Sequence, residues 1–328
     1  MTTTIVDKVV GQNGLGLMRL TDPVNPMPDE AAFKVLKAAL AEGVTLWNGA
    51  DFYGTPEHNS LHLLASYFAT YPEDADKVVV CIKSGVVDMR RYLIDGSPEC
   101  VRRLVVNANN TLRGHKKIDL FGIGRVDKNT PIEDTVGALA ELVAEGAIGG
   151  IQLSEVGAAT IRRATAVAKI DMVEEEVSLW APEIFDNGVA TTCAELGILI
   201  VAHTPLGAGM LAGKWKTADD GHHRAFPRFQ GKNFDKNLEL VSEVAKLAKA
   251  KGVTPGQLAL SWIKAQSNKP GMPFIIPISG TRSPERMREN TTTVELSGDD
   301  LKAITDILAS FPIHGTRYPE AGMKLVDF

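Results

Sequence analysis

The sequence is poor in cysteine and has no long apolar segment, and both absences exclude whole classes of protein. Its three cysteines, Cys81, Cys100 and Cys193, lie far apart and show no Cys-x-x-Cys spacing. This usage predicts free thiols in a reducing compartment. No apolar run reaches the roughly 20 residues that cross a bilayer, and residues 1–4 lack the basic start of a signal peptide. We therefore expect a cytoplasmic protein with no membrane partner.

An excess of positive charge is also lacking. The chain has 35 Lys and Arg against 40 Asp and Glu, a net charge of −5 at pH 7. This balance gives no support for binding to nucleic acid or to an anionic membrane. His58 and His62 have the i, i+4 spacing of a helical metal pair, but no third ligand is evident. We therefore expect no metal site.

A complete dinucleotide fingerprint is missing as well. Gly14 and Gly16 match the first two glycines of a G-x-G-x-x-G motif, but the third is absent. A second glycine-rich stretch, residues 207–213, has altered spacing and no convincing helix after it. A doubly wound open sheet therefore remains an alternative with little support.

What the sequence does contain is an alternation of short β-branched runs and amphipathic helices. Pro28, Thr130 and Thr254 mark predicted helix starts, Thr130 as an N-cap, and Gly43 and Gly146 mark helix ends. The strand candidates are residues 15–18, 44–47, 78–82, 118–123, 148–153, 172–177, 198–202 and 274–278. Eight strands with helices between them predict a single α/β domain over residues 1–328, a (β/α)8 TIM barrel.

Two segments outside this repeat are expected to close the barrel. A hairpin within residues 5–10 is expected to cover its bottom. The long loop of residues 204–233, after strand seven, is expected to form a lid over the opposite end.

Polar residues gather where the predicted strands end. They are Asn48 and Tyr53 after strand two, Lys83 at the end of strand three, Gly124 and Arg125 at strand four, Ser154 and Glu155 after strand five, Glu174 in strand six, His203 at strand seven and residues 279–282 after strand eight. Barrel active sites lie at this carboxyl face. The pattern therefore predicts an active site built from several strands.

Tyr53 and Lys83 indicate the chemistry of that site. A phenol has a reference pKa of ~10 and is a poor acid at neutral pH. An ammonium beside it favours the phenolate and so makes the phenol a usable proton donor. This pair suits carbonyl reduction, in which an oxygen becomes negative as hydride reaches the carbon.

These motifs resemble the aldo-keto reductases nearly from end to end. Residues 14–18 look like the family's opening strand, and residues 48–54 (Asn-Gly-Ala-Asp-Phe-Tyr-Gly) occupy the place of its Asp-Thr-Ala-x-x-Tyr-Gly motif. Lys83 matches the family lysine, residues 153–155 (Leu-Ser-Glu) its Leu-Ser-Asn/Glu segment, and residues 202–207 its Ala-Tyr-Ser-Pro-Leu-Gly loop.

The resemblance implies an NADPH site. Ser154, Glu155 and Glu174 would hold the nicotinamide carboxamide, and His203 takes the position of the tyrosine that stacks on the ring. Arg282 and Arg286 would bind the 2′-phosphate near a helix that begins at residue 283. The remaining implied cofactor residues are Gly16, Met18, Thr204, Pro205, Leu206, Gly207, Ser279, Gly280, Thr281, Glu289 and Asn290.

The sequence departs from the family's Asp-Tyr-Lys-His tetrad at two positions. Asn48 stands at the aspartate position and Gly124 at the histidine position, and Glu174 and His203 replace the Gln and Tyr under the nicotinamide. The first two departures, together with residues 121–127 and the ending at residues 311–318, resemble the fungal pyridoxal reductase branch. Without the carboxylate, we expect the full charge of Lys83 to act on Tyr53.

The substrate pocket is expected to contain Trp47, Gly124 and Arg125. Gly124 would leave room for the wide pyridoxal ring beside Arg125, although an ion pair between Arg125 and Asp127 is an alternative. Asn48 would hydrogen-bond near the reacting groups or serve only as a turn residue.

The predicted function is NADPH-dependent reduction of pyridoxal to pyridoxine, with Tyr53 as general acid. A reductase of other aldehydes, ketones or quinones in the same family is one alternative. An NADPH-binding sensor or scaffold with little turnover is another, because two tetrad positions are changed. The expected partner is a small-molecule aldehyde, and the expected state is a monomer or weak oligomer.

Overall fold

A closed barrel of eight parallel strands forms the centre of the protein. The computed structural model describes residues 2–88, 91, 93–215, 217, 226–267 and 269–326, and within these the strand order is β10-β11-β12-β3-β4-β5-β8-β9. The barrel strands are β3 (Gly14–Gly16), β4 (Leu46–Ala50), β5 (Val79–Ser84), β8 (Leu120–Ile123), β9 (Gly150–Ser154), β10 (Met172–Glu176), β11 (Leu199–His203) and β12 (Ile275–Ser279). The predicted (β/α)8 barrel is confirmed.

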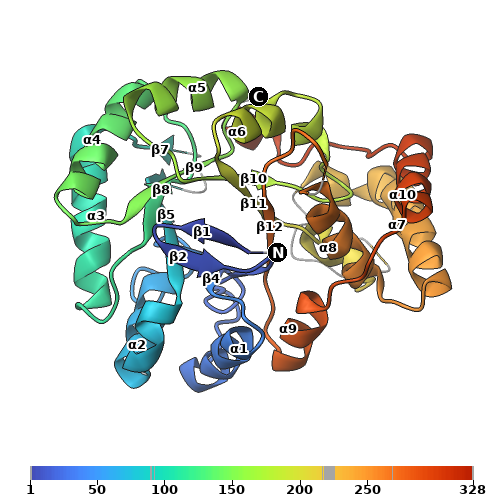
Figure 1. The fold of residues 1–328 in the computed structure, drawn as a ribbon, viewed down its shortest axis with the longest axis horizontal. Helices are drawn as coiled ribbons and strands as arrows, with labels where there is room; N and C mark the ends of the chain where they lie inside the picture. Colours follow the sequence, from blue (N-terminus) through green and yellow to red (C-terminus); the bar gives the residue numbers. More distant parts are fainter. Residues whose placement is uncertain are drawn as a thin grey trace.

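Helices surround the barrel (Figure 1). They are α1 (Asp29–Ala41), α2 (Ser60–Thr70), α3 (Pro98–Leu112), α4 (Ile132–Ala144), α5 (Ala158–Val167), α6 (Val189–Glu195), α7 (Gly231–Ala250), α8 (Pro255–Gln266), α9 (Pro284–Thr291), α10 (Gly298–Ser310) and α11 (Glu320–Met323). Apolar faces of the helices pack on outward-facing strand residues such as Val80 and Ile200 in one large core. The strands therefore pack against the helices on their outer side and against one another's side chains inside the barrel.

The predicted helix starts were right in two of three cases. Thr254 accepts from the Gln257 amide in a complete capping box at the start of α8, and α1 begins directly after Pro28. Thr130 is not the N-cap of α4. Pro131 holds that position, and the Thr130 hydroxyl donates instead to Asp127 at 2.8 Å.

The expected N-terminal hairpin is present and closes the bottom of the barrel. It consists of β1 (Thr3–Ile5) and β2 (Lys8–Val10), paired antiparallel, and it lies across the barrel axis in Figure 1. Ile5 and Val10 are buried against the first residues of the barrel strands, among them Leu46, Val79 and Leu120. This apolar plug leaves the carboxyl end of the barrel as the face available to a site.

Two insertions lie at the carboxyl end of the barrel. A small antiparallel sheet of β6 (Val86–Asp88) and β7 (Leu93–Ile94) follows β5. After β11 the chain forms the 3-10 turns Gly207–Ala212 and Pro227–Phe229, and α7 begins at Gly231. Residues 216 and 218–225 of the predicted lid loop lie outside the described residues, and its last three residues belong to α7.

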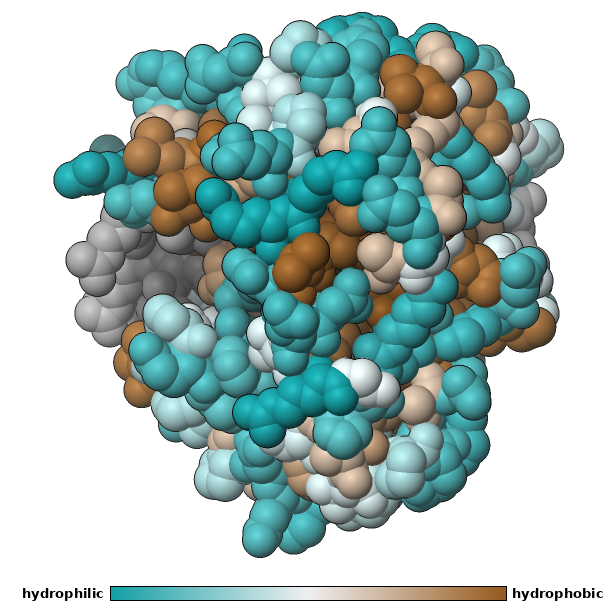
Figure 2. All heavy atoms as spheres, turned by 90° about the vertical axis from the view of Figure 1, so that its left-hand side faces the viewer, coloured by the Kyte–Doolittle hydropathy of each residue, from teal (hydrophilic) through white to brown (hydrophobic). Residues whose placement is uncertain are grey.

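The helices on the left of Figure 1 form a mainly hydrophilic outer face, shown in Figure 2. Hydrophobic residues there are gathered in small, separate groups. Of the helices that the structure describes, none is long and apolar enough to cross a membrane.

Candidate active site

Tyr53 sits on a tight turn after β4 that only glycine can close. Its carbonyl accepts from the Thr21 hydroxyl at 2.7 Å and from the Ser60 amide at 3.2 Å. The next residue, Gly54, has φ +128°, and a Cβ there would lie 2.3 Å from the His58 carbonyl oxygen. A side chain at position 54 would therefore displace the loop that holds Tyr53 in place.

Lys83 reaches the same place from the neighbouring strand β5. Its side chain is only 2% exposed, and its Nζ lies 5.2 Å from the centroid of the Tyr53 ring. Burial by itself would lower the pKa of Lys83, but Glu174 and Tyr53 raise it above the usual lysine value. The expected Tyr–Lys pair is therefore brought together, with the lysine held charged.

The expectation that Lys83 lacks a neutralising carboxylate is wrong. Glu174 of β10 places Oε2 2.7 Å from Lys83 Nζ, and Asn48 accepts from the same ammonium through Oδ1 at 2.5 Å. Asn48 Nδ2 donates to Glu174 Oε2 at 2.8 Å, which closes a triangle. Burial acts to raise the pKa of Glu174, but the charge of Lys83 holds it below its usual range.

Trp47 does not belong to the substrate pocket. It is fully buried on the outside of the barrel, with its ring 5.4 Å from Tyr67 and 6.0 Å from Phe68, and its Nε1 donates to the Val44 carbonyl. Side chains alternate along a strand. Because Asn48 faces the barrel interior, its neighbour Trp47 must face the helices.

Gly124 is not bordered by open space as expected. A Cβ at this position would lie 3.2 Å from Phe52 Cζ and 3.5 Å from the Ser84 carbonyl oxygen. Phe52 packs edge-on against the Tyr53 ring, with centroids 5.0 Å apart. The room that a missing side chain leaves is thus taken by Phe52, a residue that the sequence analysis did not single out.

Arg125 points into the site and does not pair with Asp127. Its guanidinium donates to the Gly124 carbonyl at 2.5 Å, to Ser154 Oγ at 3.5 Å and to the Tyr318 hydroxyl at 3.2 Å. Asp127 instead accepts from the Gly96 amide. Burial would lower the pKa of Arg125, but Tyr318, Glu155 and Tyr53 raise it, so the guanidinium stays protonated.

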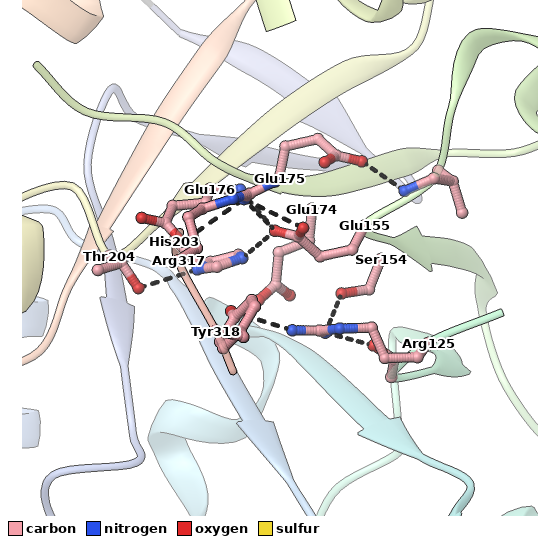
Figure 3. Close-up of polar contacts among 12 residues, drawn as sticks. Arg125, Ser154, Glu155, Glu174, Glu175, Glu176, His203, Thr204, Arg317 and Tyr318 are labelled. Carbon is pink, nitrogen blue, oxygen red and sulfur yellow. Dashed lines mark hydrogen bonds and ion pairs between the residues drawn. The ribbon is translucent and has the colours of Figure 1, made fainter. Parts of the chain in front are cut away.

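A second buried cluster joins β9, β10 and β11 to the C-terminal segment (Figure 3). Glu155, fully buried, lies 2.6 Å from His203 Nε2 and 3.1 Å from Arg317 Nη1, and it also accepts from the Glu176 amide. Burial acts to raise the pKa of Glu155, but His203, Arg125 and Arg317 hold it well below its usual range. Its carboxylate is thus engaged by the protein itself.

The role of the C-terminal segment was missed at the level of sequence. Arg317 and Tyr318 follow α10 without any regular periodicity, so no helix or strand pattern points to their side chains. Their place in the site follows only from the path of the chain back over the barrel.

Basic side chains gather near the amino terminus of α9. Ser283 caps this helix through its hydroxyl, which accepts from the Arg286 amide at 3.1 Å. Arg282 donates to the carbonyls of Arg19 and Asn25, and Arg286 pairs with Glu289 at 2.7 Å on the surface. The expected residues Ser279, Thr281 and Asn290 are buried beside them.

Two further basic residues, Lys214 and Arg19, lie near this cluster and were not named in the sequence analysis. Burial, Arg286 and Arg19 together lower the pKa of Lys214, against a weaker opposing effect of Glu289. Lys214 is thus close enough to Arg286 and Arg19 to feel their charge, and positive charge near a helix amino terminus favours a bound anion.

The remaining predicted residues lie around the carboxyl end of the barrel. Gly16 lies so close to β12 that a Cβ would meet the Ile278 carbonyl oxygen at 3.2 Å. Met18 is 45% exposed, and Thr204 Oγ1 lies 3.0 Å from His203 Nδ1. Pro205, Leu206 and Gly280 lie in the loops after β11 and β12, and Gly207 begins the 3-10 turn Gly207–Ala212.

The two spaced histidines have other partners. His58 Nε2 lies 3.0 Å from Asp29, and His62 completes the capping box of Asn59 at the start of α2. Among the residues that the structure describes, no three His, Cys, Asp or Glu side chains are grouped to hold a metal.

Comparison with known proteins finds the same architecture and related sequences. The sequence profile of the Aldo/keto reductase family matches residues 14–309. The chain is 40% identical to "Probable pyridoxal reductase 2" of Schizosaccharomyces pombe, over 94% of this chain and 95% of that one. It is 36% identical to "Probable aldo-keto reductase 1" of Glycine max, over 94% and 88%. A solved glycerol dehydrogenase of Gluconobacter oxydans shares the fold, with a TM-score of 0.82, 24% identity and coverage of 96% and 97%.

Proposed function

The chain belongs to the aldo/keto reductase family, whose cofactor is NADPH, and from that premise we propose that it reduces the aldehyde pyridoxal to pyridoxine. The observation that carries the proposal is the buried, charged Lys83 with its Nζ 5.2 Å from the ring centroid of Tyr53. A phenol beside a buried ammonium supports proton delivery to a carbonyl oxygen. The name of the fission-yeast relative supports the choice of pyridoxal.

The residues present fit NADPH. Arg286 in the first turn of α9, with Lys214, whose pKa Arg286 and Arg19 lower, suits the cofactor's phosphates. Gly16 places no side chain at the carboxyl end of β3, where a Cβ would meet the Ile278 carbonyl oxygen at 3.2 Å. Bound there, NADPH would supply the hydride for the aldehyde carbon, and Ser154 with His203 would border the nicotinamide.

The side chains of this protein supply the proton and the charge. Tyr53 donates its hydroxyl proton to the aldehyde oxygen as negative charge develops there. The Lys83 ammonium stabilises the phenolate that this leaves. Asn48 and Glu174 hold Lys83 in position, because they occupy its other hydrogen bonds.

Arg125 and Tyr318 are suited to the pyridoxal ring. Pyridoxal carries a phenolate oxygen, which a guanidinium binds well. The Arg125 guanidinium lies 5.8 Å from the Tyr318 ring centroid and 3.2 Å from its hydroxyl. An incoming ring with an anionic oxygen can take over this contact.

The assay that tests the proposal follows NADPH oxidation with pyridoxal beside a panel of aldehydes, ketones and quinones. We expect pyridoxal to give the highest kcat/KM. If another carbonyl compound gave a kcat/KM at least tenfold higher, that compound and not pyridoxal would be the better candidate substrate. Bound NADPH without turnover of any compound would indicate a sensor instead.

Gly124 and Phe52 together are expected to set the width of the pocket. A Gly124→His side chain must displace Phe52, whose ring lies 3.2 Å from the added Cβ. We expect kcat/KM for pyridoxal to fall about tenfold or more, with a smaller loss for a slim aldehyde such as propanal. Combining the change with Phe52→Ala should recover part of the pyridoxal activity. Equal losses for both aldehydes would refute a role in substrate shape.

A further inference from the structure

Lys83 has an acidic partner from the far side of the barrel. Glu174 lies on β10, which is not a neighbour of β4 or β5 in the barrel order. Its carboxylate nevertheless reaches Lys83 Nζ at 2.7 Å and Asn48 Nδ2 at 2.8 Å. Both side chains of the ion pair are nearly fully buried, at 2% and 3% exposure.

The hydrogen bonds of Asn48 show that the negative charge in this cluster belongs to Glu174. Asn48 Oδ1 faces the ammonium of Lys83, and Nδ2 faces the carboxylate of Glu174. In this arrangement every donor in the triangle meets an acceptor. A carboxylate at position 48 would face a second carboxylate at about the same distance, which is unfavourable in a buried site.

The sequence shows an acid and an amide exchanged relative to the family pattern. In the resemblance drawn from the sequence motifs, aspartate corresponds to Asn48 and glutamine to Glu174. Since the two side chains are one hydrogen bond apart, the exchange moves the negative charge by that distance and leaves Lys83 neutralised.

We propose that Glu174 is the positioning residue for Lys83, supplying from β10 the carboxylate that Asn48 replaces on β4, and that it therefore acts through the lysine rather than on the nicotinamide. A buried ammonium without a carboxylate is unstable in its charged form. Glu174 keeps Lys83 charged and pointed at Tyr53. The proposal rests on the proposed function only for its activity measurement.

The test uses a charge-exchange cycle. Glu174→Gln removes the carboxylate, and adding Asn48→Asp returns one to the same cluster. With whichever aldehyde the wild type reduces, we expect Glu174→Gln to lower kcat roughly 10- to 100-fold, less than loss of the general acid itself. The double variant should return to within about threefold of wild type. A folded double variant no faster than Glu174→Gln alone would overturn the proposal.

The pH profile separates positioning from simple support of the fold. Without Glu174, burial lowers the pKa of Lys83, so its charge is lost at a lower pH. We expect the kcat of Glu174→Gln to fall on the basic side at lower pH than in wild type, and the double variant to restore the profile. An unchanged profile would contradict the proposal.

Thermal unfolding without cofactor gives a measurement that does not depend on activity. Lysine titrates at a pKa of ~10.4 in the unfolded chain. A buried Lys83 whose folded pKa is lowered costs stability below that folded value, and the cost vanishes as the pH rises towards 10.4. The Tm deficit of Glu174→Gln should therefore be largest near pH 7 and shrink as the pH is raised.

Glu175→Gln is the matched control. Glu175 is the next residue on β10 and equally buried, but alternation along the strand turns its side chain away from that of Glu174, and it accepts from the Val156 amide (Figure 3). Burial and the neighbouring Glu155 raise its pKa well above the usual value, and a Gln side chain keeps the acceptor oxygen that the Val156 amide needs. We expect a Tm difference that is flat with pH and an unchanged kcat. If Glu174→Gln behaves like this control, the proposal fails; if no aldehyde is reduced by wild type but the pH-dependent deficit appears, only the proposed function fails.

Discussion

Tyr53→Phe is expected to lower kcat by about 10²- to 10⁴-fold while leaving the Kd for NADPH within about twofold of wild type. Removing the hydroxyl removes the proton donor, and general acid catalysis contributes rate factors of this size. The ring stays, so its edge-on packing with Phe52 and the turn held by Thr21 are retained. Steady-state kinetics and fluorescence titration of NADPH measure the two effects.

Tyr71→Phe is the matched control for this change. Tyr71 follows α2 at its carboxyl end, where its ring packs against Phe33 and Tyr67. Helices of the barrel return towards the amino ends of the strands, so this hydroxyl lies away from the site. We expect its loss to leave kcat unchanged. A Tyr53→Phe enzyme that kept wild-type kcat would rule out Tyr53 as the acid.

The barrel could be predicted because its strands are short, buried and rich in β-branched residues. Residues 78–82 and 172–177, for example, lie within a residue or two of the observed β5 and β10. Parallel strands end at one face, so Tyr53 and Lys83 could be expected to meet. The family resemblance strengthened that expectation.

The position of Trp47 shows a signal that was present but not used. Alternation along β4 puts Asn48 inside, so Trp47 must face the helices. The partner of Lys83 is a different case. Glu174 lies 91 residues away along the chain and across the barrel, and no local pattern encodes a contact across the interior.

The contributions of Phe52, Arg317 and Tyr318 also depend on tertiary structure. Nothing in residues 311–318 marks a strand or helix, yet this segment brings Arg317 to Glu155 and Tyr318 to Arg125. In the sequence, the tetrad departures at Asn48 and Gly124 indicate a missing carboxylate and a missing side chain. In the folded protein, Glu174 places a carboxylate beside Asn48, and Phe52 fills the space beside Gly124.

Arg286→Ala is expected to weaken NADPH binding about 10- to 100-fold and NADH binding less than threefold. NADPH differs from NADH by the 2′-phosphate, and a charge-assisted hydrogen bond to such a group contributes about 1.5–3 kcal/mol. Arg286 lies in the first turn of α9, close enough to Lys214 to lower its pKa. Its present partner Glu289 is on the surface, so exchanging that ion pair for a phosphate costs little.

Arg288→Ala provides the matched control on the same helix. Arg288 is 58% exposed and lies 3.9 Å from Glu42, and its removal tests whether any loss of positive charge on α9 suffices. We expect it to change the Kd of both cofactors less than twofold, measured at one fixed ionic strength because distant charges are screened by salt. If Arg286→Ala weakened NADPH and NADH equally, Arg286 would not bind the 2′-phosphate. Discrimination between the cofactors would then come from another cation of the cluster, such as Arg282, whose guanidinium is held by the carbonyls of Arg19 and Asn25.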